Sequence, residues 1–265
     1  MNNEIELIKP IVRVGNSAGV ILPREWLHGK AKVVLLEERL EPEQEIFGIL
    51  RSYLSDIMAL ALVGSYARGE QGAESDVDAL AITHSTNKRI KHGKYEIILI
   101  SEDRLGKYLE GNIFPLLPML IEAKSLINGE LINKYKNFKL TRRNLSFHFE
   151  TTKSIMNVVK ADIELDKEMG ESCAGDADAY SLILRLRGIY IVNCLLKGKI
   201  WSKREFLQLV KKVAGSLKVY DGYVRIKNDK AKRIHSLPIE EAEKLHSYIV
   251  AGIKKQEKEW VKIGK

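Results

Sequence analysis

Two aspartates separated by one residue, Asp76 and Asp78, are the clearest candidates for catalytic or metal-binding residues in this sequence. The apolar run at residues 77–83 predicts a β-strand that begins between them. Side chains two residues apart on a strand point to the same face, so we expect the two carboxylates to lie side by side. Two like charges in this position are costly unless a cation neutralises them. An oxygen-only site of this kind suits Mg²⁺, which keeps water ligands and shares phosphate oxygens of a substrate.

A Gly-Ser turn lies a short distance before the aspartates, at the end of the apolar run at residues 57–63. Gly64 lets a phosphate approach the backbone closely, and Ser65 offers a backbone N–H and a hydroxyl. Arg68 adds a fixed fork of donors. Two metal ions beside such donors are the arrangement for nucleotidyl transfer, in which one ion activates the attacking oxygen and the other holds the triphosphate and the leaving pyrophosphate.

The stretch from residue 63 to residue 79 resembles the nucleotidyltransferase superfamily of DNA polymerase β. The family pattern is an apolar residue, Gly, Gly or Ser, a spacer, and then Asp, an apolar residue and Asp or Glu. Here ten residues separate Ser65 from Asp76, inside the family's range. The Gly-Ser-x-Ala-Arg-Gly run and Ser75 match the small stand-alone branch, the aminoglycoside nucleotidyltransferases and the minimal nucleotidyltransferases of prokaryotes. The resemblance covers residues 43–138. It implies that an NTP is bound by Gly64, Ser65, Arg68 and Ser75.

The same resemblance implies a third carboxylate on a neighbouring strand, and Glu96 lies at the expected place. It is the only acid in the apolar run at residues 95–101, and burial of an unpaired glutamate would be costly. The first interpretation is therefore that Asp76, Asp78 and Glu96 together form the catalytic, metal-binding set. The alternative is that Glu96 lies on an edge strand and faces water.

Residues 1–40 form a separate pattern of short β segments, over 11–14, 20–22 and 32–35, with one helical turn after Pro23. So short a unit cannot bury enough surface alone, so we expect a second copy to complete it in a homodimer. Its Gly-Asn-Ser-x-Gly and Leu-Pro-x-Glu runs resemble the swapped-hairpin domain of the AbrB/SpoVT/MazE type. That resemblance implies a small dimeric β-barrel that contacts DNA through basic side chains; the alternative is a domain that only dimerises. The basic candidates are Lys9, Arg13 and Arg24.

The elements that must position these residues follow from the hydrophobic pattern. Apolar runs predict strands over residues 57–63, 77–83, 95–101 and 124–127, with helices over 43–55, 103–111 and 114–122. Farther along, the helical period predicts helices over 146–168, 176–197, 203–214, 218–233 and 239–260. The expected fold class is α+β, with a swapped-hairpin β-barrel completed by dimerisation (1–40), a mixed-sheet nucleotidyltransferase domain (41–138) and a helical substrate-covering domain (139–265).

The charge of the chain is unevenly distributed. The formal net charge of +8 divides into +1 in residues 1–40, −3 in residues 41–138 and +10 in residues 139–265. A basic part next to an acidic part suggests a partner with phosphates; the alternative is a solvated basic surface.

The composition also excludes several classes of protein. The longest apolar run, at residues 57–64, is far shorter than the ~20 residues that span a bilayer. The N-terminus lacks the pattern of a signal peptide, and two cysteines make neither a disulfide framework nor a zinc site. We expect a cytoplasmic protein without a membrane partner.

The function predicted from these observations is Mg²⁺-dependent transfer of NMP from NTP to a hydroxyl on a small molecule, a protein or an RNA end, with release of pyrophosphate. The alternative is a DNA-binding regulator or antitoxin-like protein whose nucleotidyltransferase domain senses nucleotide or is inactive.

Two weaker signals lie in the helical part. Residues 220–227 mix aromatic and basic side chains that could contact a nucleotide or simply pack, and Arg143 and His148 have a spacing found in some helical ribonucleases.

Overall fold

The computed structural model describes residues 6–34, 41–72, 75–228 and 235–263. The chain divides into two compact units, Met1–Glu41 and Pro42–Lys265. Each is described by itself.

The first unit is a β-hairpin with short flanking segments. Strands β1 (Ile11–Val14) and β2 (Ser17–Val20) pair antiparallel across a turn in which Gly15 has a φ of +59°. A single 3₁₀ turn, Arg24–Trp26, follows Pro23 as predicted. The second strand ends at Val20, earlier than predicted. Residues 32–34 form no strand, and Leu35, the end of that predicted strand, lies outside the described residues. No residue among 6–34 is buried, and these residues close no barrel, so the swapped-hairpin barrel stays a prediction.

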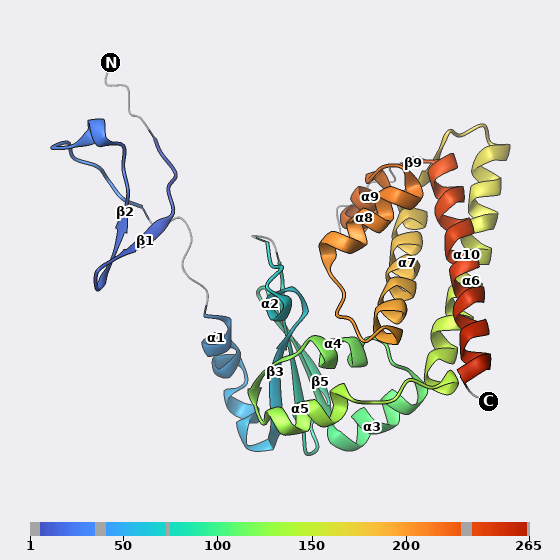
Figure 1. Ribbon diagram of the computed structural model, residues 1–265, viewed down its shortest axis with the longest axis horizontal. Coiled ribbons are helices and arrows are strands. Elements are labelled where there is room, and N and C mark those ends of the chain that lie inside the picture. Colours follow the sequence, from blue (N-terminus) through green and yellow to red (C-terminus); the bar gives the residue numbers. More distant parts are fainter. Residues whose placement is uncertain (1–5, 35–40, 73–74, 229–234, 264–265) are drawn as a thin grey trace. The chain divides into compact units, whose positions relative to one another are not determined.

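The second unit is built on a mixed five-stranded sheet with the order β5-β6-β4-β3-β7 (Figure 1). Strands β4 and β6 are parallel and the other neighbours are antiparallel. Apolar runs predicted four of the strands with their observed bounds. The fifth, β5, was not predicted because four of its five residues are basic. The strands are β3 (Ile57–Val63), β4 (Val77–Thr83), β5 (Lys88–His92), β6 (Tyr95–Ser101) and β7 (Lys124–Ile127).

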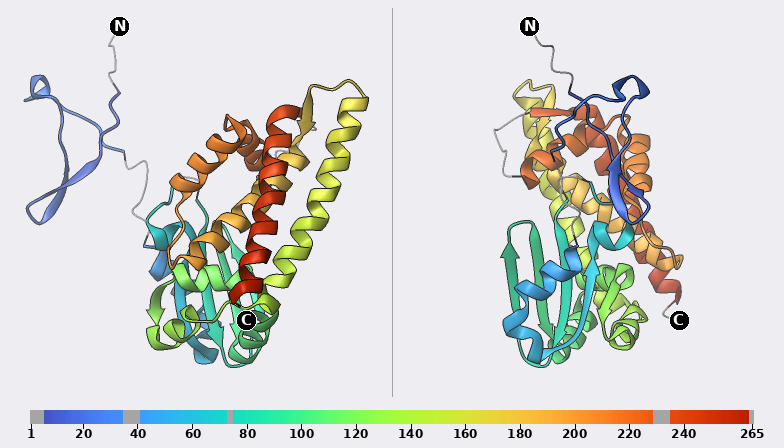
Figure 2. Two further views of the ribbon diagram at one scale, coloured as in Figure 1. Left: turned by 45° about the vertical axis from the view of Figure 1, so that its right-hand side comes forward. Right: turned by 90° about the vertical axis from the view of Figure 1, so that its left-hand side faces the viewer.

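Helices cover both faces of this sheet (Figure 2). On one face α1 (Pro42–Ile49) packs Ile46 against a cluster that includes Leu60, Leu62 and Ile97. The helix predicted over 43–55 is interrupted, because residues 51–56 form a 3₁₀ helix. The other face packs against the second core cluster of the molecule. Its helices are α3 (Glu102–Gly111), α4 (Leu116–Glu122) and α5 (Gly129–Lys136).

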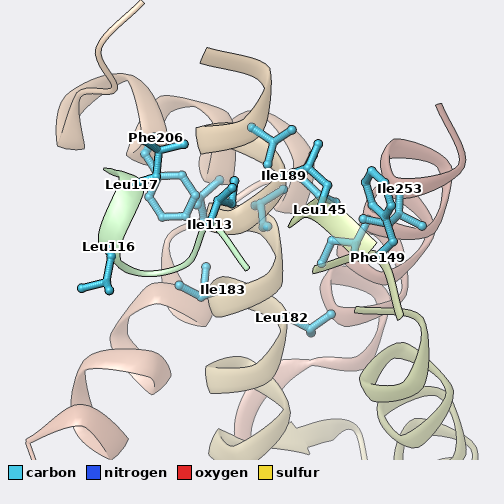
Figure 3. Close-up of a cluster of buried hydrophobic side chains, with 14 of the residues drawn as sticks. Ile113, Leu116, Leu117, Leu145, Phe149, Leu182, Ile183, Ile189, Phe206 and Ile253 are labelled. Carbon is cyan, nitrogen blue, oxygen red and sulfur yellow. The ribbon is translucent and has the colours of Figure 1, made fainter. Parts of the chain in front are cut away.

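The helical part follows without a break in the core. Ile113 and Leu117 pack in one cluster with Leu145 and Phe149 of α6 and Ile183 of α7 (Figure 3). The domain boundary expected between residues 138 and 139 therefore falls inside one compact unit. The helices are α6 (Arg142–Glu168), α7 (Asp176–Leu196), α8 (Lys203–Ala214), α9 (Lys218–Lys227) and α10 (Ile239–Ile263), with a two-stranded ladder of β8 (Cys173–Gly175) and β9 (His235–Pro238).

Helix α7 lies at the centre of this part and contacts α6, α8, α9 and α10. Among the described helices it alone has the length and apolar composition of a membrane span. The helix predicted over 218–233 ends at Lys227, and residues 229–233 of that prediction lie outside the described residues.

Candidate active site

The structure brings Asp78 and Glu96 together at one end of the sheet. Asp78 is the second residue of β4, and in the register it lies between Val63 of β3 and Glu96 of β6. Residues paired across neighbouring strands project from the same face. Strand β6 is covered on its outer side by β5, so the prediction of an edge strand for Glu96 is wrong. The Glu96 side chain is 28% exposed.

The electrostatics of this end of the sheet are dominated by like charges. Burial and, after it, the neighbouring carboxylates of Glu96 and Asp76 together raise the pKa of the Asp78 carboxyl to about 6. Lys227 acts in the opposite direction. A carboxylate that is partly desolvated and surrounded by acids is a site at which a bound cation is stabilised.

Gly64 is fitted closely against Asp78. Its φ of +71° lies in the left-handed region, and a Cβ on this residue would come within 2.5 Å of Asp78 Oδ2. The helical turn α2 (Gly64–Arg68) begins here. Both the backbone conformation and the space therefore require glycine. The Gly64 N–H donates to Glu122 Oε1 at 2.7 Å, so the turn is held by the last residue of α4.

Arg68 is held by two carboxylates. Its Nη1 donates to Glu122 and its Nε donates to Glu70 Oε2 at 2.9 Å. The Arg68 and Glu122 side chains are 11% and 6% exposed, so this is a largely desolvated pair. Glu70 also accepts from the backbone N–H of Lys203 at the start of α8, at 3.0 Å. Arg68, placed on the triphosphate by sequence, thus links the Gly-Ser turn to the helical part.

The two outer carboxylates each have a basic partner. Asp76 Oδ2 lies 3.6 Å from Nζ of Lys227, the last residue of α9. Glu96 pairs with Arg89 of β5. Within the described part of the chain, no three His, Cys, Asp or Glu side chains are grouped closely enough to hold a metal ion. The donor set nevertheless fits a hard divalent cation, since it consists of carboxylates whose mutual repulsion already raises the pKa of Asp78.

The remaining predicted nucleotide contacts, Ser65 and Ser75, differ in their surroundings. Ser65 lies in α2, and its hydroxyl makes no hydrogen bond to any described residue. The Ser75 hydroxyl accepts from the Gly72 N–H at 2.9 Å and so closes the loop before β4. Lys9, Arg13 and Arg24 are exposed in the first unit, where Arg13 Nε donates to the Gly15 carbonyl at 2.9 Å.

Sequence reasoning missed Glu70 and Glu122, and it noted Lys227 only as part of the basic and aromatic segment 220–227. Glu122 had a usable signal: it is the only acid in an otherwise apolar helix, the same signal that singled out Glu96. Glu70 had none, because its link to the Lys203 N–H joins residues far apart in the chain. For Lys227, nothing in the sequence pointed to Asp76 as its partner.

Packing explains the histidine and the tyrosines among the weaker signals of the helical part. His148 is buried, with Nε2 3.4 Å from Gln256 Oε1, and burial lowers its pKa to about 4. It is a core side chain, which removes the basis for the ribonuclease interpretation. Tyr220 and Tyr223 pack against the same core, with ring centroids 5.6 Å apart.

The fold and the site define a mixed-sheet domain whose strand ends carry converging carboxylates beside a glycine turn. Residues 43–147 match the sequence model of the family described as Nucleotidyltransferase domain. The chain therefore contains a nucleotidyltransferase domain.

Two solved structures are similar to most of the chain. A nucleotidyltransferase-like protein from Exiguobacterium sibiricum is 16% identical, with a TM-score of 0.37, over 81% of this chain and 75% of that one. A spectinomycin adenyltransferase from Enterococcus faecialis, solved with ATP and spectinomycin, is 15% identical, with a TM-score of 0.40, over 82% of this chain and 100% of that one. No curated protein matches the sequence significantly.

Substitution of Gly64 by alanine tests the fit against Asp78. We expect Gly64→Ala to lower stability by about 1–2 kcal/mol through its left-handed backbone and to reduce transfer about 100-fold, because the new Cβ displaces the Asp78 carboxylate. Gly198→Ala is the matched control. Gly198 also has a positive φ, +61°, but its Cβ would meet nothing within 4 Å. Thermal melts and transfer rates should show a stability loss in both variants and a rate loss only at Gly64.

Proposed function

We propose that the protein transfers NMP from NTP to a hydroxyl acceptor with Mg²⁺ as cofactor and releases pyrophosphate. The observation that carries this proposal is the register of Asp78 with Glu96, directly beside the Gly64 turn. The family match over residues 43–147 supports NMP transfer in general. The acceptor could be a small molecule, a protein side chain or an RNA end.

The residues proposed to hold Mg²⁺ are Asp76, Asp78 and Glu96. When bound, the metal supplies charge neutralisation for the triphosphate and activates the acceptor oxygen. Gly64 leaves open the space against Asp78 that a side chain would fill. The Ser65 hydroxyl is available to a phosphate oxygen, and Arg68 and Glu122 hold the turn in place.

Lys227 adds a positive charge to this site. It is half-exposed, and its 3.6 Å distance from Asp76 is that of a loose pair. A cation on the carboxylates would compete with Lys227 for Asp76, and Lys227 could then pair with a phosphate of the NTP. The helical part would in this way contribute to nucleotide binding.

Transfer of label from each of the four α-labelled NTPs, with Mg²⁺ and a panel of hydroxyl acceptors, tests the proposed reaction. Wild type should label an acceptor and release pyrophosphate, and the Asp76→Ala/Asp78→Ala variant should do neither. Chelation of divalent ions should abolish the wild-type reaction. Equal labelling by both proteins would contradict the assignment of these carboxylates.

A second proposal concerns the first unit, which we infer to be a homodimerisation domain. Its hairpin buries no residue among 6–34, so a second copy is the natural source of its core. Exposed Lys9, Arg13 and Arg24 would then form a basic face toward DNA. Binding of duplex DNA that weakens with salt and with Arg13→Ala/Arg24→Ala would support DNA contact; salt-independent behaviour would leave dimerisation as the role.

A further inference from the structure

The edge strand β5 carries a concentrated positive charge beside the candidate active site. Its sequence is Lys-Arg-Ile-Lys-His, and its four polar side chains are all exposed. The segment from residue 41 to 138 is otherwise acidic, with 11 basic and 14 acidic residues. Between β5, α1 and Tyr53 lies an open groove of about 670 Å³. It is lined by Glu45, Gly48, Ile49, Tyr53, Lys88, Arg89, Ile90, Lys91 and His92.

The pleat of β5 places its basic residues on both faces of the sheet. Ile90 packs in the cluster under α1, so Lys88 and His92, two residues to either side, face α1 as well. Arg89 and Lys91 face the opposite side, toward the catalytic carboxylates. Lys91 is the register partner of Glu96. Positively charged side chains therefore extend along β5 from the groove to Lys91, the residue paired with Glu96.

Most of this charge is not neutralised by acidic neighbours. Among the described residues, Lys91 and His92 have no ion pair, and Glu45 is the only acid that lines the groove. Lys88 donates to the Tyr53 hydroxyl at 2.7 Å and lies 5.3 Å from the ring centroid. Charged residues, lysine in particular, protect an edge strand from pairing, and the same exposed side chains are available to a polyanion.

An aromatic ring among cations along an extended path is the pattern that binds single-stranded nucleic acid. We propose that the groove between β5 and α1 binds the phosphodiester backbone of a single-stranded polynucleotide, whose 3′ end is the acceptor at Asp78 and Glu96. The strand spans about 14 Å, enough for several phosphate contacts. The identity of the acceptor rests on the proposed function; the binding surface does not.

The reaction implied for this acceptor is chain extension by one nucleotide. The 3′ hydroxyl oxygen forms a bond to the α-phosphorus of the NTP, and the bond from that phosphorus to the pyrophosphate oxygen breaks. The hydroxyl proton passes to a carboxylate of the site and then to water. The products are a new phosphodiester and pyrophosphate.

Fluorescence anisotropy with a short labelled oligoribonucleotide, and with its deoxy counterpart, tests the binding surface. We expect Lys88→Gln/Lys91→Gln to weaken binding at least tenfold at low salt and to reduce the slope of log K against log salt by about 1.4, since each lost phosphate contact contributes about 0.7. The control Lys254→Gln/Lys258→Gln removes two exposed lysines of α10 and should bind as wild type. Equal binding by the groove variant and wild type would overturn the proposal, and the two oligonucleotides show whether RNA or DNA is preferred.

Extension of the same oligonucleotide by labelled ATP tests the acceptor. Wild type should extend a free 3′ hydroxyl and not a 3′-phosphorylated end, and the groove variant should show a raised KM for the oligonucleotide with kcat unchanged. Binding without extension, while another acceptor is labelled, would overturn the acceptor assignment alone. No transfer to any acceptor would count against the proposed function and leave the binding result standing.

Discussion

Replacement of Asp78 by asparagine is expected to abolish NMP transfer and, in the metal-free protein, to stabilise the fold. The substitution removes a carboxylate proposed to bind the metal, whose contribution to the transition state is several kcal/mol. A loss of about 4 kcal/mol corresponds to about a 10³-fold lower rate. The same substitution removes a half-buried charge that lies beside Glu96 and Asp76. Activity and stability should therefore change in opposite directions, which a purely structural residue would not produce.

The pH dependence of this stabilisation follows from the raised pKa of Asp78. The folded protein holds the proton with a pKa of about 6, against an ordinary value of 3.8. Above pH 6 the carboxyl is ionised in both states and the folded state bears the full cost, about 1–3 kcal/mol for this half-buried group. Below pH 3.8 it is protonated in both states and the cost is absent. The stability gain of Asp78→Asn should thus be largest above pH 6 and disappear as the pH falls through this window.

Urea unfolding at several pH values and transfer assays measure both effects. Asp56→Asn is the matched control, because hydrogen bonds from Thr86 and Ser85 lower the pKa of Asp56 instead of raising it. That variant should be less stable near neutral pH and retain transfer. Added Mg²⁺ should raise the Tm of wild type more than that of Asp78→Asn. Retention of transfer by Asp78→Asn would exclude this carboxylate from the metal site.

The parts of the fold that sequence could predict are those decided by local hydrophobic pattern. Strands β3, β4 and β6 are apolar runs bounded by polar or glycine residues, and β7 is a short run that ends at an Asn-Gly turn. The placement of Glu96 near Asp78 was implied by the family resemblance, with the Asp-x-Asp spacing in one segment and a single acid in another as its local signals. Neither inference required knowledge of distant parts of the chain.

The parts that escaped prediction depend on partners far away in the chain. Strand β5 has a basic sequence and is held by backbone pairing with β6 rather than by an apolar face. The pairing of Arg68 with Glu122 escaped prediction because the two residues are 54 positions apart in the chain. Lys227 reaches Asp76 only because the helical part packs on the same core as the sheet. Such pairs are determined by tertiary packing, and the hydrophobic periodicity of a sequence carries no information about which distant residues meet.

The first unit yields the other prediction with a large effect, that Ile21→Asp converts the protein from dimer to monomer. The hairpin exposes nine large apolar side chains and buries none among residues 6–34. Ile21 is 69% exposed. Burial of one such side chain against a second copy is worth about 1.5–3 kcal/mol, and an aspartate there would also bury a charge. The dimer dissociation constant should rise by at least about 100-fold.

Sedimentation velocity over a range of protein concentrations measures this change. Ile200→Asp is the control, since Ile200 is 59% exposed but belongs to the second unit, and its dimer should resemble wild type. Transfer to a small acceptor should be unchanged in Ile21→Asp if the first unit only dimerises the chain. If Ile21→Asp lowers both the fraction of dimer and the affinity for duplex DNA, the basic faces of the two copies bind DNA jointly. A wild-type protein that stays monomeric at every concentration would contradict dimerisation through residues 6–34.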